Sequence, residues 1–479
     1  MERSEYQMLD GLSLATLLRS KQVSPAELMQ CAVALGEASD CEFNSLCYVR
    51  ADEALALAEK AELKGQFGAL PFLLKDSGLA STYLRSSVGS RLFADLKSPV
   101  NATLNERFIA DGFISFGRTT VPEFCMAPTT EAVQNNGPTL NPWDKTRSAG
   151  GSSGGAAVAV STGVVPIAHG SDGGGSIRIP AACCGVYGLK PSRGLVPMGP
   201  WRGEAWGGLA ADGVLTRTVR DTAAALDGIV GMELGAPYAA PEIPGKYLDL
   251  IDRPFTRPLK IAKWTGAFDD IPVAEECVAA VEATARLLKD MGHDVVEAPL
   301  PEIKYKSFLR SHQDVLAASV TLTVNGKLRS SPDDGWREKL EPAMVDAYDL
   351  GKALSAETYA LAINRFHTIA RQMELYISDY DFILSPTLTQ MPAKLGTLTM
   401  ANDFRTFRNR VGDYTTFLAI INASGQPAAN VPVYWTRDGL PVGIQLIGHF
   451  GREADVLRLS ARLEEASPWI ERYRRRGEQ

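Results

Sequence analysis

Two patterns of hydrophobic and polar residues alternate along the chain. Segments that mix both kinds over about 10 to 20 residues are typical of helices, and the short apolar runs between them are typical of buried strands. The mixed segments cover residues 23–35, 51–65, 103–113, 216–231 and 453–466. The apolar runs cover residues 69–76, 114–120, 259–264, 380–386 and 440–448. Residues 272–298 follow the pattern of a helix and then that of a strand. This alternation predicts an α/β fold whose sheet is largely parallel and covered by helices.

Local signals refine these elements. Ser24, Pro25 and Glu27 form a capping signal at the start of the first helix, and Gly65 is a stop signal for the second. Residues from about 305 to 380 follow a helical pattern without a convincing strand. With no internal repeat or long linker, the chain is predicted to be a single domain, 1–479, with a helical insertion at about 305–380.

Composition and charge narrow the class of protein. The 479 residues are 45% hydrophobic and 22% charged with a net charge of −7, which is typical of a soluble globular protein and gives no field that attracts nucleic acid or anionic lipid. No apolar run approaches the about 18 residues of a membrane span. The seven cysteines are scattered and odd in number, which favours a reduced compartment. We therefore expect a cytoplasmic monomer or homodimer without nucleic-acid or membrane partners.

The stretch 148–194 places glycine–serine clusters at both ends of an apolar middle. "GSDGGGSI" has the glycine spacing of a phosphate-binding loop, but Ser176-Ile177 stands where lysine and serine or threonine are needed. "GSSGG" fits a nucleophile elbow around Ser153, but the residues before it do not read as a strand. The histidines are isolated from one another, so neither a metal nor a cofactor is predicted; they are His169, His293, His312, His367 and His449.

One kind of catalytic site remains, in which a lysine activates a serine nucleophile. Gly173, Gly174 and Gly175 let the N–H groups of residues 173–176 converge on one point, as an oxyanion hole requires. Ser176 then begins a helical segment, 176–185. A serine nucleophile needs a base, and Lys75 at the end of an apolar strand is the best candidate, because burial lowers the proton affinity of lysine. Judged from the residues alone, a surface pair between Lys75 and Asp76 is equally compatible.

Three motifs decide between these interpretations. "GGSSGG" at 150–155, "DGGGSIRIPA" at 172–181 and "GLKPSRG" at 188–194 resemble the amidase signature family of serine hydrolases, and "PFLLKD", "NPWD", "LTRTVRDTA", "SGQPAANVP" and "GLPVGIQLIG" match in order. The resemblance weakens over 305–380. It implies an α/β fold with a large, twisted, mixed sheet covered on both faces by helices.

The resemblance also implies roles for particular residues. Ser176 is the nucleophile, Lys75 the base and Ser152 the bridging serine, which lies 24 residues before Ser176 as the family requires and follows a cis peptide bond. Residues 173–176 supply the oxyanion hole. Ser153 and the tryptophans Trp201 and Trp206, in the loop 196–213, are candidates for substrate contacts.

The expected activity is hydrolysis of small, largely apolar or aryl amides, with carbamates and esters as further substrates. The motifs look closer to the branch that contains 6-aminohexanoate-cyclic-dimer hydrolase and aryl acylamidases than to glutamine-using subunits. Two alternatives stay open: a glutamine-hydrolysing subunit of a transamidation complex that binds partner proteins and tRNA, and a non-catalytic binding protein on the same scaffold.

Overall fold

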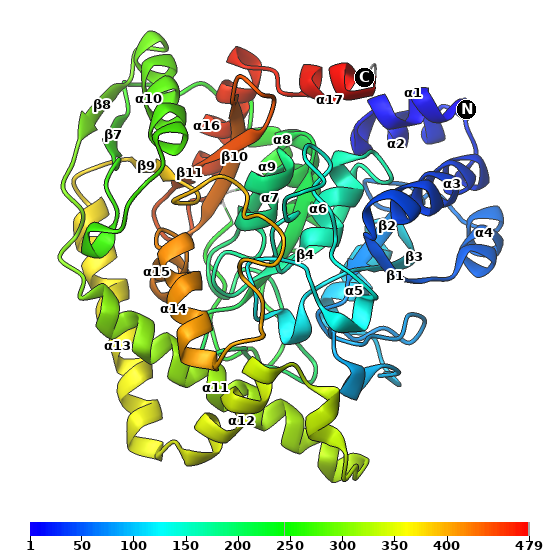
Figure 1. Cartoon of the computed structure of the whole chain (residues 1–479). Coiled ribbons are helices and arrows are strands. Elements are labelled where there is room, and N and C mark those ends of the chain that lie inside the picture. The colour runs from blue at the N-terminus through cyan, green and yellow to red at the C-terminus, as the bar shows by residue number, and fades with distance from the viewer. Residues whose placement is uncertain (244, 478–479) are drawn as a thin grey trace.

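An eight-stranded sheet forms the centre of the molecule (Figure 1). The computed structural model describes residues 1–243 and 245–477. The strand order is β4-β6-β5-β10-β11-β9-β7-β8. The strands are β4 (Ile167–Asp172), β5 (Tyr187–Lys190), β6 (Ala211–Thr216), β7 (Lys260–Lys263), β8 (Asp294–Glu297), β9 (Phe382–Pro386), β10 (Ala428–Trp435) and β11 (Pro441–Ile447).

The prediction of a largely parallel sheet is wrong. Neighbouring strands from β4 to β9 pair antiparallel, and β7 pairs parallel with both β9 and β8, so the sheet is mixed. Strands β10 and β11 form a hairpin closed by the turn 436–440, and hairpin partners are necessarily antiparallel. The alternation of helices and strands in the sequence does not distinguish such connections from crossovers.

A smaller sheet carries Lys75. Its order is β1 (Leu46–Val49), β3 (Phe113–Thr119) and β2 (Leu70–Lys75), with β2 parallel to β3. Every residue of β2 is buried, because this strand also packs against β4 of the large sheet and against helix α6 (Gly154–Ser161). Lys75 is therefore held where the two sheets meet.

Helices cover both faces of the large sheet. Helices α7 and α10 pack against β10 and β11, and α8 packs against β5 and β6. The helices outside the insertion are α1 (Arg3–Met8), α2 (Gly11–Arg19), α3 (Pro25–Phe43), α4 (Ala51–Glu59), α5 (Thr103–Ala110), α6, α7 (Arg178–Cys184), α8 (Val219–Ile229), α9 (Tyr247–Leu250), α10 (Glu275–Asp290), α14 (Phe404–Tyr414), α15 (Ala419–Ser424), α16 (Glu453–Ala466) and α17 (Ile470–Gly477). The capping box predicted at Ser24 and Glu27 is present at the start of α3.

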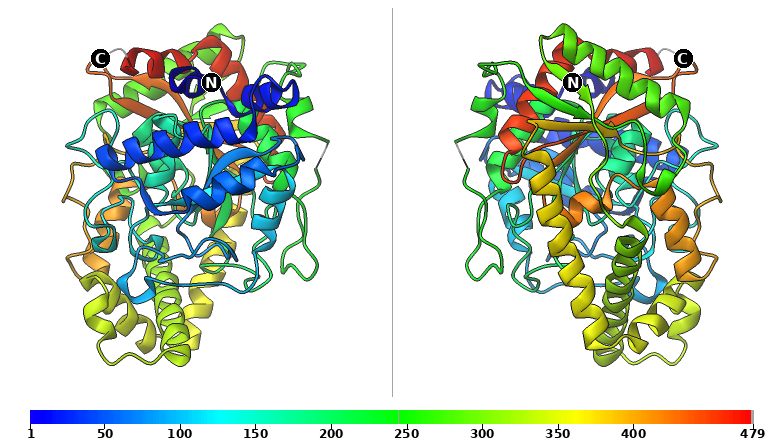
Figure 2. Two further views of the ribbon diagram at one scale, coloured as in Figure 1. Left: turned by 90° about the vertical axis from the view of Figure 1, so that its right-hand side faces the viewer. Right: turned by 90° about the vertical axis from the view of Figure 1, so that its left-hand side faces the viewer.

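The segment predicted to be helical contains three helices: α11 (Tyr305–Ser330), α12 (Pro342–Ala353) and α13 (Ala356–Ile377). They pack on one another and extend from the end of the molecule opposite the two chain termini (Figures 1 and 2). Their position matters for the site, since α11 also forms one wall of the cavity described below.

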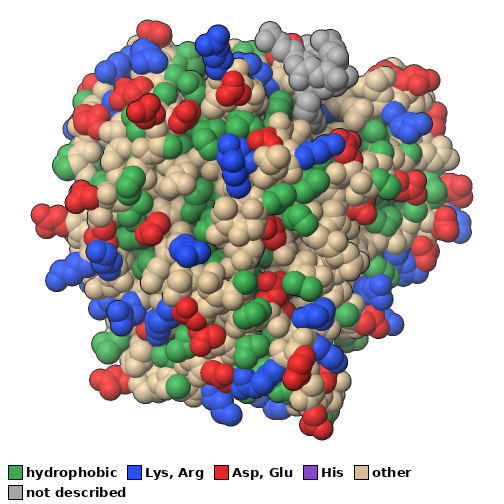
Figure 3. All heavy atoms as spheres, viewed as in Figure 1, with side chains coloured by type: hydrophobic (Ala, Val, Ile, Leu, Met, Phe, Trp, Pro, Cys, Tyr) green, Lys and Arg blue, Asp and Glu red, His purple; other side chains and the backbone are tan. Residues whose placement is uncertain are grey.

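Charged side chains of both signs are mixed on the surface (Figure 3), as expected from the small net charge of the sequence. Lys and Arg side chains are interspersed with Asp and Glu over the face shown in Figure 3. None of the helices in the described part of the chain combines the length and hydropathy that crossing a bilayer requires.

Candidate active site

Lys75 is wholly buried and faces two serines. Its Nζ donates to Ser152 Oγ at 2.8 Å and to the side chain and carbonyl oxygens of Ser171 at 3.0 and 3.1 Å. Burial lowers the pKa of Lys75 below its usual 10.5. Asp76 is also buried and accepts hydrogen bonds from Ser86 and Ser87, so the two side chains do not form a surface pair.

Ser152 lies in the first glycine–serine cluster, two residues before the start of α6. The peptide bond between Gly151 and Ser152 is cis, as the family resemblance implies. Gly151 lies so close to Thr129 that a Cβ on it would be 2.5 Å from the Thr129 carbonyl oxygen. Only glycine therefore fits beside the bridging serine.

Ser176 lies in the turn that joins β4 to α7 and lines the same cavity as Ser152. No hydrogen bond joins the two hydroxyl groups in the structure as described, so the contact that would pass a proton between them is not formed at rest. Catalytic hydrogen bonds commonly tighten only when substrate is bound.

The structure corrects the prediction for Ser153. Its side chain is fully buried, does not line the cavity, and donates to the carbonyl oxygen of Ser176 at 2.6 Å. The Ser153 hydroxyl is therefore bonded to the Ser176 backbone and does not face the cavity. The same orientation excludes Ser153 as the nucleophile of an elbow.

Two glycines of the run, Gly173 and Gly175, pack against neighbours that leave no room for a Cβ. A Cβ on Gly173 would lie 2.3 Å from the Trp206 ring, and Gly175 has a φ of +119°. The Gly175 N–H donates to Asp172 Oδ1 at 2.7 Å and is thus already bonded. The N–H groups of Gly173, Gly174 and Ser176 have no acceptor among the described residues, which leaves three of the four predicted donors available.

Two functional neighbours were not found from the sequence, Ser171 and Asp172. Both directly precede the glycine run, and polar residues at the end of an otherwise apolar strand were the available signal. Asp172 receives hydrogen bonds from Arg178 Nε at 2.9 Å and from Asn422 Nδ2 at 2.9 Å. Although burial raises the pKa of Asp172, these partners hold it below its usual range.

His169 belongs to the core, as the sequence suggested. It is fully buried, accepts the backbone N–H of Lys75 at its Nδ1 (3.2 Å) and contacts Asp212 Oδ1 through Nε2 (3.1 Å). Burial lowers its pKa. It therefore supports the backbone of strand β2 at Lys75.

A cavity of about 460 Å³ opens in front of Ser152 and Ser176. Trp201 and Trp206 line it, as predicted, and Trp201 is 70% exposed. Further apolar walls come from several parts of the chain, namely Leu79, Val88, Phe124, Met126, Met198, Val320, Leu322 and Tyr359. A volume of this size is typical of small-molecule sites.

Comparison with known proteins fits this arrangement. The family model described as "Amidase" matches residues 27–457. The chain belongs to the amidase signature family. It is 31% identical over 478 residues to 6-aminohexanoate-cyclic-dimer hydrolase of Paenarthrobacter ureafaciens, with 97% of this chain and 96% of the relative covered.

Solved structures show the same likeness and confirm the predicted mixed α/β fold. A 6-aminohexanoate cyclic dimer hydrolase complexed with substrate matches with a TM-score of 0.91 at 30% identity, covering 97% of this chain and 98% of the other. A bacterial aryl acylamidase of the amidase signature family matches with a TM-score of 0.88 at 28% identity, covering 98% and 99%. The protein is an amidase-family enzyme that acts on amide C–N bonds.

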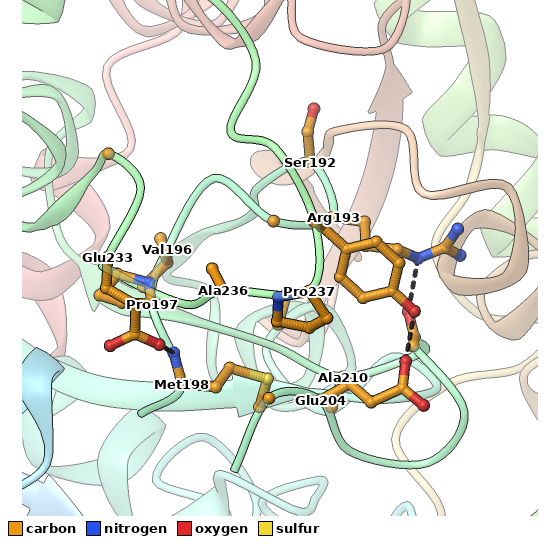
Figure 4. Close-up of a pocket in the computed structure, with 16 residues that line it drawn as sticks. Ser192, Arg193, Val196, Pro197, Met198, Glu204, Ala210, Glu233, Ala236 and Pro237 are labelled. Carbon is orange, nitrogen blue, oxygen red and sulfur yellow. Dashed lines mark hydrogen bonds between the residues drawn. The ribbon is translucent and has the colours of Figure 1, made fainter. Parts of the chain in front are cut away.

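The tryptophan loop of this amidase is held at its base by two glutamates. Glu233 accepts the N–H groups of Met198 and Gly199 at 3.2 and 2.7 Å, and Glu204 accepts the Tyr238 hydroxyl. Figure 4 shows Met198, Glu204 and Glu233 around a second, smaller pocket. Hydrogen bonds to the rest of the chain therefore hold the loop that forms this wall of the cavity.

The buried Asp172–Arg178 pair yields a stability prediction. Asp172→Ala leaves the Arg178 guanidinium buried without a carboxylate, so we expect a loss of about 3–5 kcal/mol in the free energy of unfolding. Urea denaturation measures this change. The control is Asp349→Ala, which breaks a surface pair with Arg337 and is expected to cost at most about 1 kcal/mol. Equal losses in the two variants would contradict the assigned role of Asp172.

Proposed function

We propose that this amidase hydrolyses small, largely apolar or aryl amides through Lys75, Ser152 and Ser176, with carbamates and esters as further substrates. The observation that carries the proposal is the 2.8 Å contact between buried Lys75 Nζ and Ser152 Oγ, beside an apolar cavity that also exposes Ser176. A base, a relay and a nucleophile thus meet at one end of a substrate-sized space.

The first half-reaction follows from this geometry. Neutral Lys75 takes a proton from Ser152, which takes the proton of Ser176 as Ser176 Oγ bonds to the amide carbon. The carbonyl π electrons move to oxygen, where the N–H groups of Gly173, Gly174 and Ser176 stabilise the negative charge. These donors accelerate the reaction because the negative charge on the substrate oxygen develops only in the transition state, so they stabilise the transition state more than the bound substrate.

The second half-reaction returns the enzyme to its starting state. As the C–N bond breaks, Ser152 gives its proton to the leaving amine and regains one from Lys75. Water then attacks the acyl-enzyme with Lys75 and Ser152 again taking up its proton. The acyl–Oγ bond breaks, Ser176 recovers its proton, and the carboxylic acid leaves.

The lining of the cavity supports the substrate class. Two tryptophans and several aliphatic side chains favour apolar groups on the substrate. The names of the similar proteins, a hydrolase of a cyclic amide dimer and an aryl acylamidase, support the same class.

A substrate panel tests the function. Purified enzyme is assayed with an anilide, an aliphatic amide, an aryl carbamate, a p-nitrophenyl ester and glutamine, each beside Ser176→Ala. Anilide or aliphatic amide turnover that disappears in the variant is the expected result. Turnover of glutamine alone would overturn the proposal in favour of an amidotransferase subunit, and turnover of none would favour a binding protein.

The lowered pKa of Lys75 predicts the pH dependence. Because the neutral amine is the base, kcat/KM rises as pH increases through the pKa of Lys75 and levels off below its usual 10.5. Folding stability gains from the same rise in pH, since the unfolded chain binds this proton more tightly. The measurement is the pH profile of kcat/KM on an uncharged anilide. A rate that falls as pH rises through neutrality would contradict the role of Lys75 as base.

A further inference from the structure

The charged side chains that line the substrate cavity differ in how they are paired. Asp212 contacts the ring of His169 at 3.1 Å, and Glu204 accepts the Tyr238 hydroxyl. Arg202, an exposed residue on the same loop as Glu204, forms no hydrogen bond or ion pair with any residue that the structure describes. The cavity therefore contains one cation whose donors are unused.

The Arg202 guanidinium lies beside Gly78, which lines the same cavity. A Cβ on Gly78 would be 3.4 Å from Arg202 Nη2, and Gly78 follows Lys75 by three residues. The charge of Arg202 also reaches the Cys125 thiol. Burial raises the pKa of this thiol, and the charges of Lys75 and Arg202 and a hydrogen bond with Ser152 oppose that rise.

An exposed arginine that lines a cavity with several apolar walls and has free donors is suited to one kind of ligand group. Its planar guanidinium binds a carboxylate through two parallel hydrogen bonds. The acids Glu204 and Asp212 line the same cavity and disfavour ligands with several negative charges. A single carboxylate on an otherwise apolar molecule satisfies both conditions.

We propose that Arg202 binds a carboxylate of the substrate, so that the preferred substrates are apolar amides with one carboxylate on the acyl or the amine part. This inference rests on the proposed function and specifies its substrate class. Arg202 acts in recognition, and the reaction at Ser176 is the one described above.

Matched substrates test the proposal. The acyl-side pair is succinyl p-nitroanilide and 4-methylpentanoyl p-nitroanilide, in which an isopropyl group replaces the carboxylate. The amine-side pair is 4-acetamidobenzoate and 4-isopropylacetanilide. For the wild type, kcat/KM for the charged member of at least one pair is expected to exceed that of the neutral member by about 10- to 100-fold.

Variants assign the preference to Arg202. In Arg202→Gln this ratio falls to about one, and Arg202→Lys keeps only part of it, because lysine lacks the planar pair of donors. The control Arg286→Gln removes the same charge from the exposed face of α10 and keeps the wild-type ratio. A wild-type ratio of one or below, or an Arg202→Gln ratio equal to that of the wild type, would overturn the proposal.

A binding experiment tests the role of Arg202 separately from the proposed catalytic roles of Lys75, Ser152 and Ser176. Calorimetry on Ser176→Ala measures the affinity for the charged member of each pair, with and without Arg202→Gln, whatever the turnover. Binding that weakens at least about tenfold on loss of Arg202 supports carboxylate recognition even if no substrate is hydrolysed. Equal binding in both backgrounds contradicts it even if amides are cleaved.

Discussion

Ser176→Ala is expected to lower kcat on amides by at least about 10⁴-fold, because the substitution removes the proposed attacking oxygen. The neighbouring Ser153 cannot substitute, since its hydroxyl is buried and bonded to the Ser176 carbonyl oxygen. The residual rate then comes from substrate binding and from the N–H groups of the glycine run. Steady-state kinetics on the best substrate of the panel measures the loss.

The control for this variant is Ser331→Ala, an exposed serine after α11 that is expected to leave kcat within error of the wild type. Circular dichroism and thermal unfolding show whether Ser176→Ala is folded. A folded Ser176→Ala enzyme that retains a tenth or more of the wild-type kcat would show that another group is the nucleophile.

Lys75→Met is expected to lower kcat by about 10³-fold or more. The substitution keeps much of the side-chain volume in the buried site but removes the amine that contacts Ser152 and Ser171. General-base catalysis alone is worth about 10²- to 10⁴-fold, and residues that act as one unit lose most of their effect together. Kinetics of Lys75→Met measures the loss, with the exposed Lys289→Met as control.

The double variant sharpens this test. If Lys75 acts only through Ser176, Lys75→Met combined with Ser176→Ala is no slower than Ser176→Ala alone. Additive losses would indicate that Lys75 supports catalysis in some other way.

The sequence predicted elements well where local chemistry decides them. The strand that ends at Lys75 and the capped helix after Ser24 are present. At Gly65 the local reading was wrong: α4 already ends at Glu59, and Gly65 packs where a Cβ would meet the Asp111 backbone at 2.2 Å. A glycine that a tertiary contact requires looks the same in sequence as one that ends a helix.

Contacts between distant segments were out of reach of such reasoning. The wall that α11 contributes to the cavity, and the placement of Arg202 beside Gly78, depend on how the insertion and the tryptophan loop fold back on the sheets. No local pattern encodes these contacts. The antiparallel pairing of the large sheet was missed for the same reason.

For the site itself, motif and structure contributed different parts. The glycine run pointed to Ser176, an apolar strand pointed to Lys75, and the family resemblance added Ser152. That the amine of Lys75 contacts Ser152 depends on the packing of β2 against β4 and α6, which only the fold provides. The hydrogen bond from the Gly175 N–H to Asp172 Oδ1 likewise could not be predicted from the sequence.

The most direct test of the account is covalent labelling of the nucleophile. Wild type, Ser176→Ala and Lys75→Met are treated with a fluorophosphonate, digested and analysed by mass spectrometry, with the rate of labelling followed in time. The account predicts one adduct on Ser176 in the wild type, none in Ser176→Ala, and labelling slowed at least about 100-fold in Lys75→Met. An adduct on a different residue, or equal labelling rates in wild type and Lys75→Met, would contradict a Ser176 nucleophile activated by Lys75.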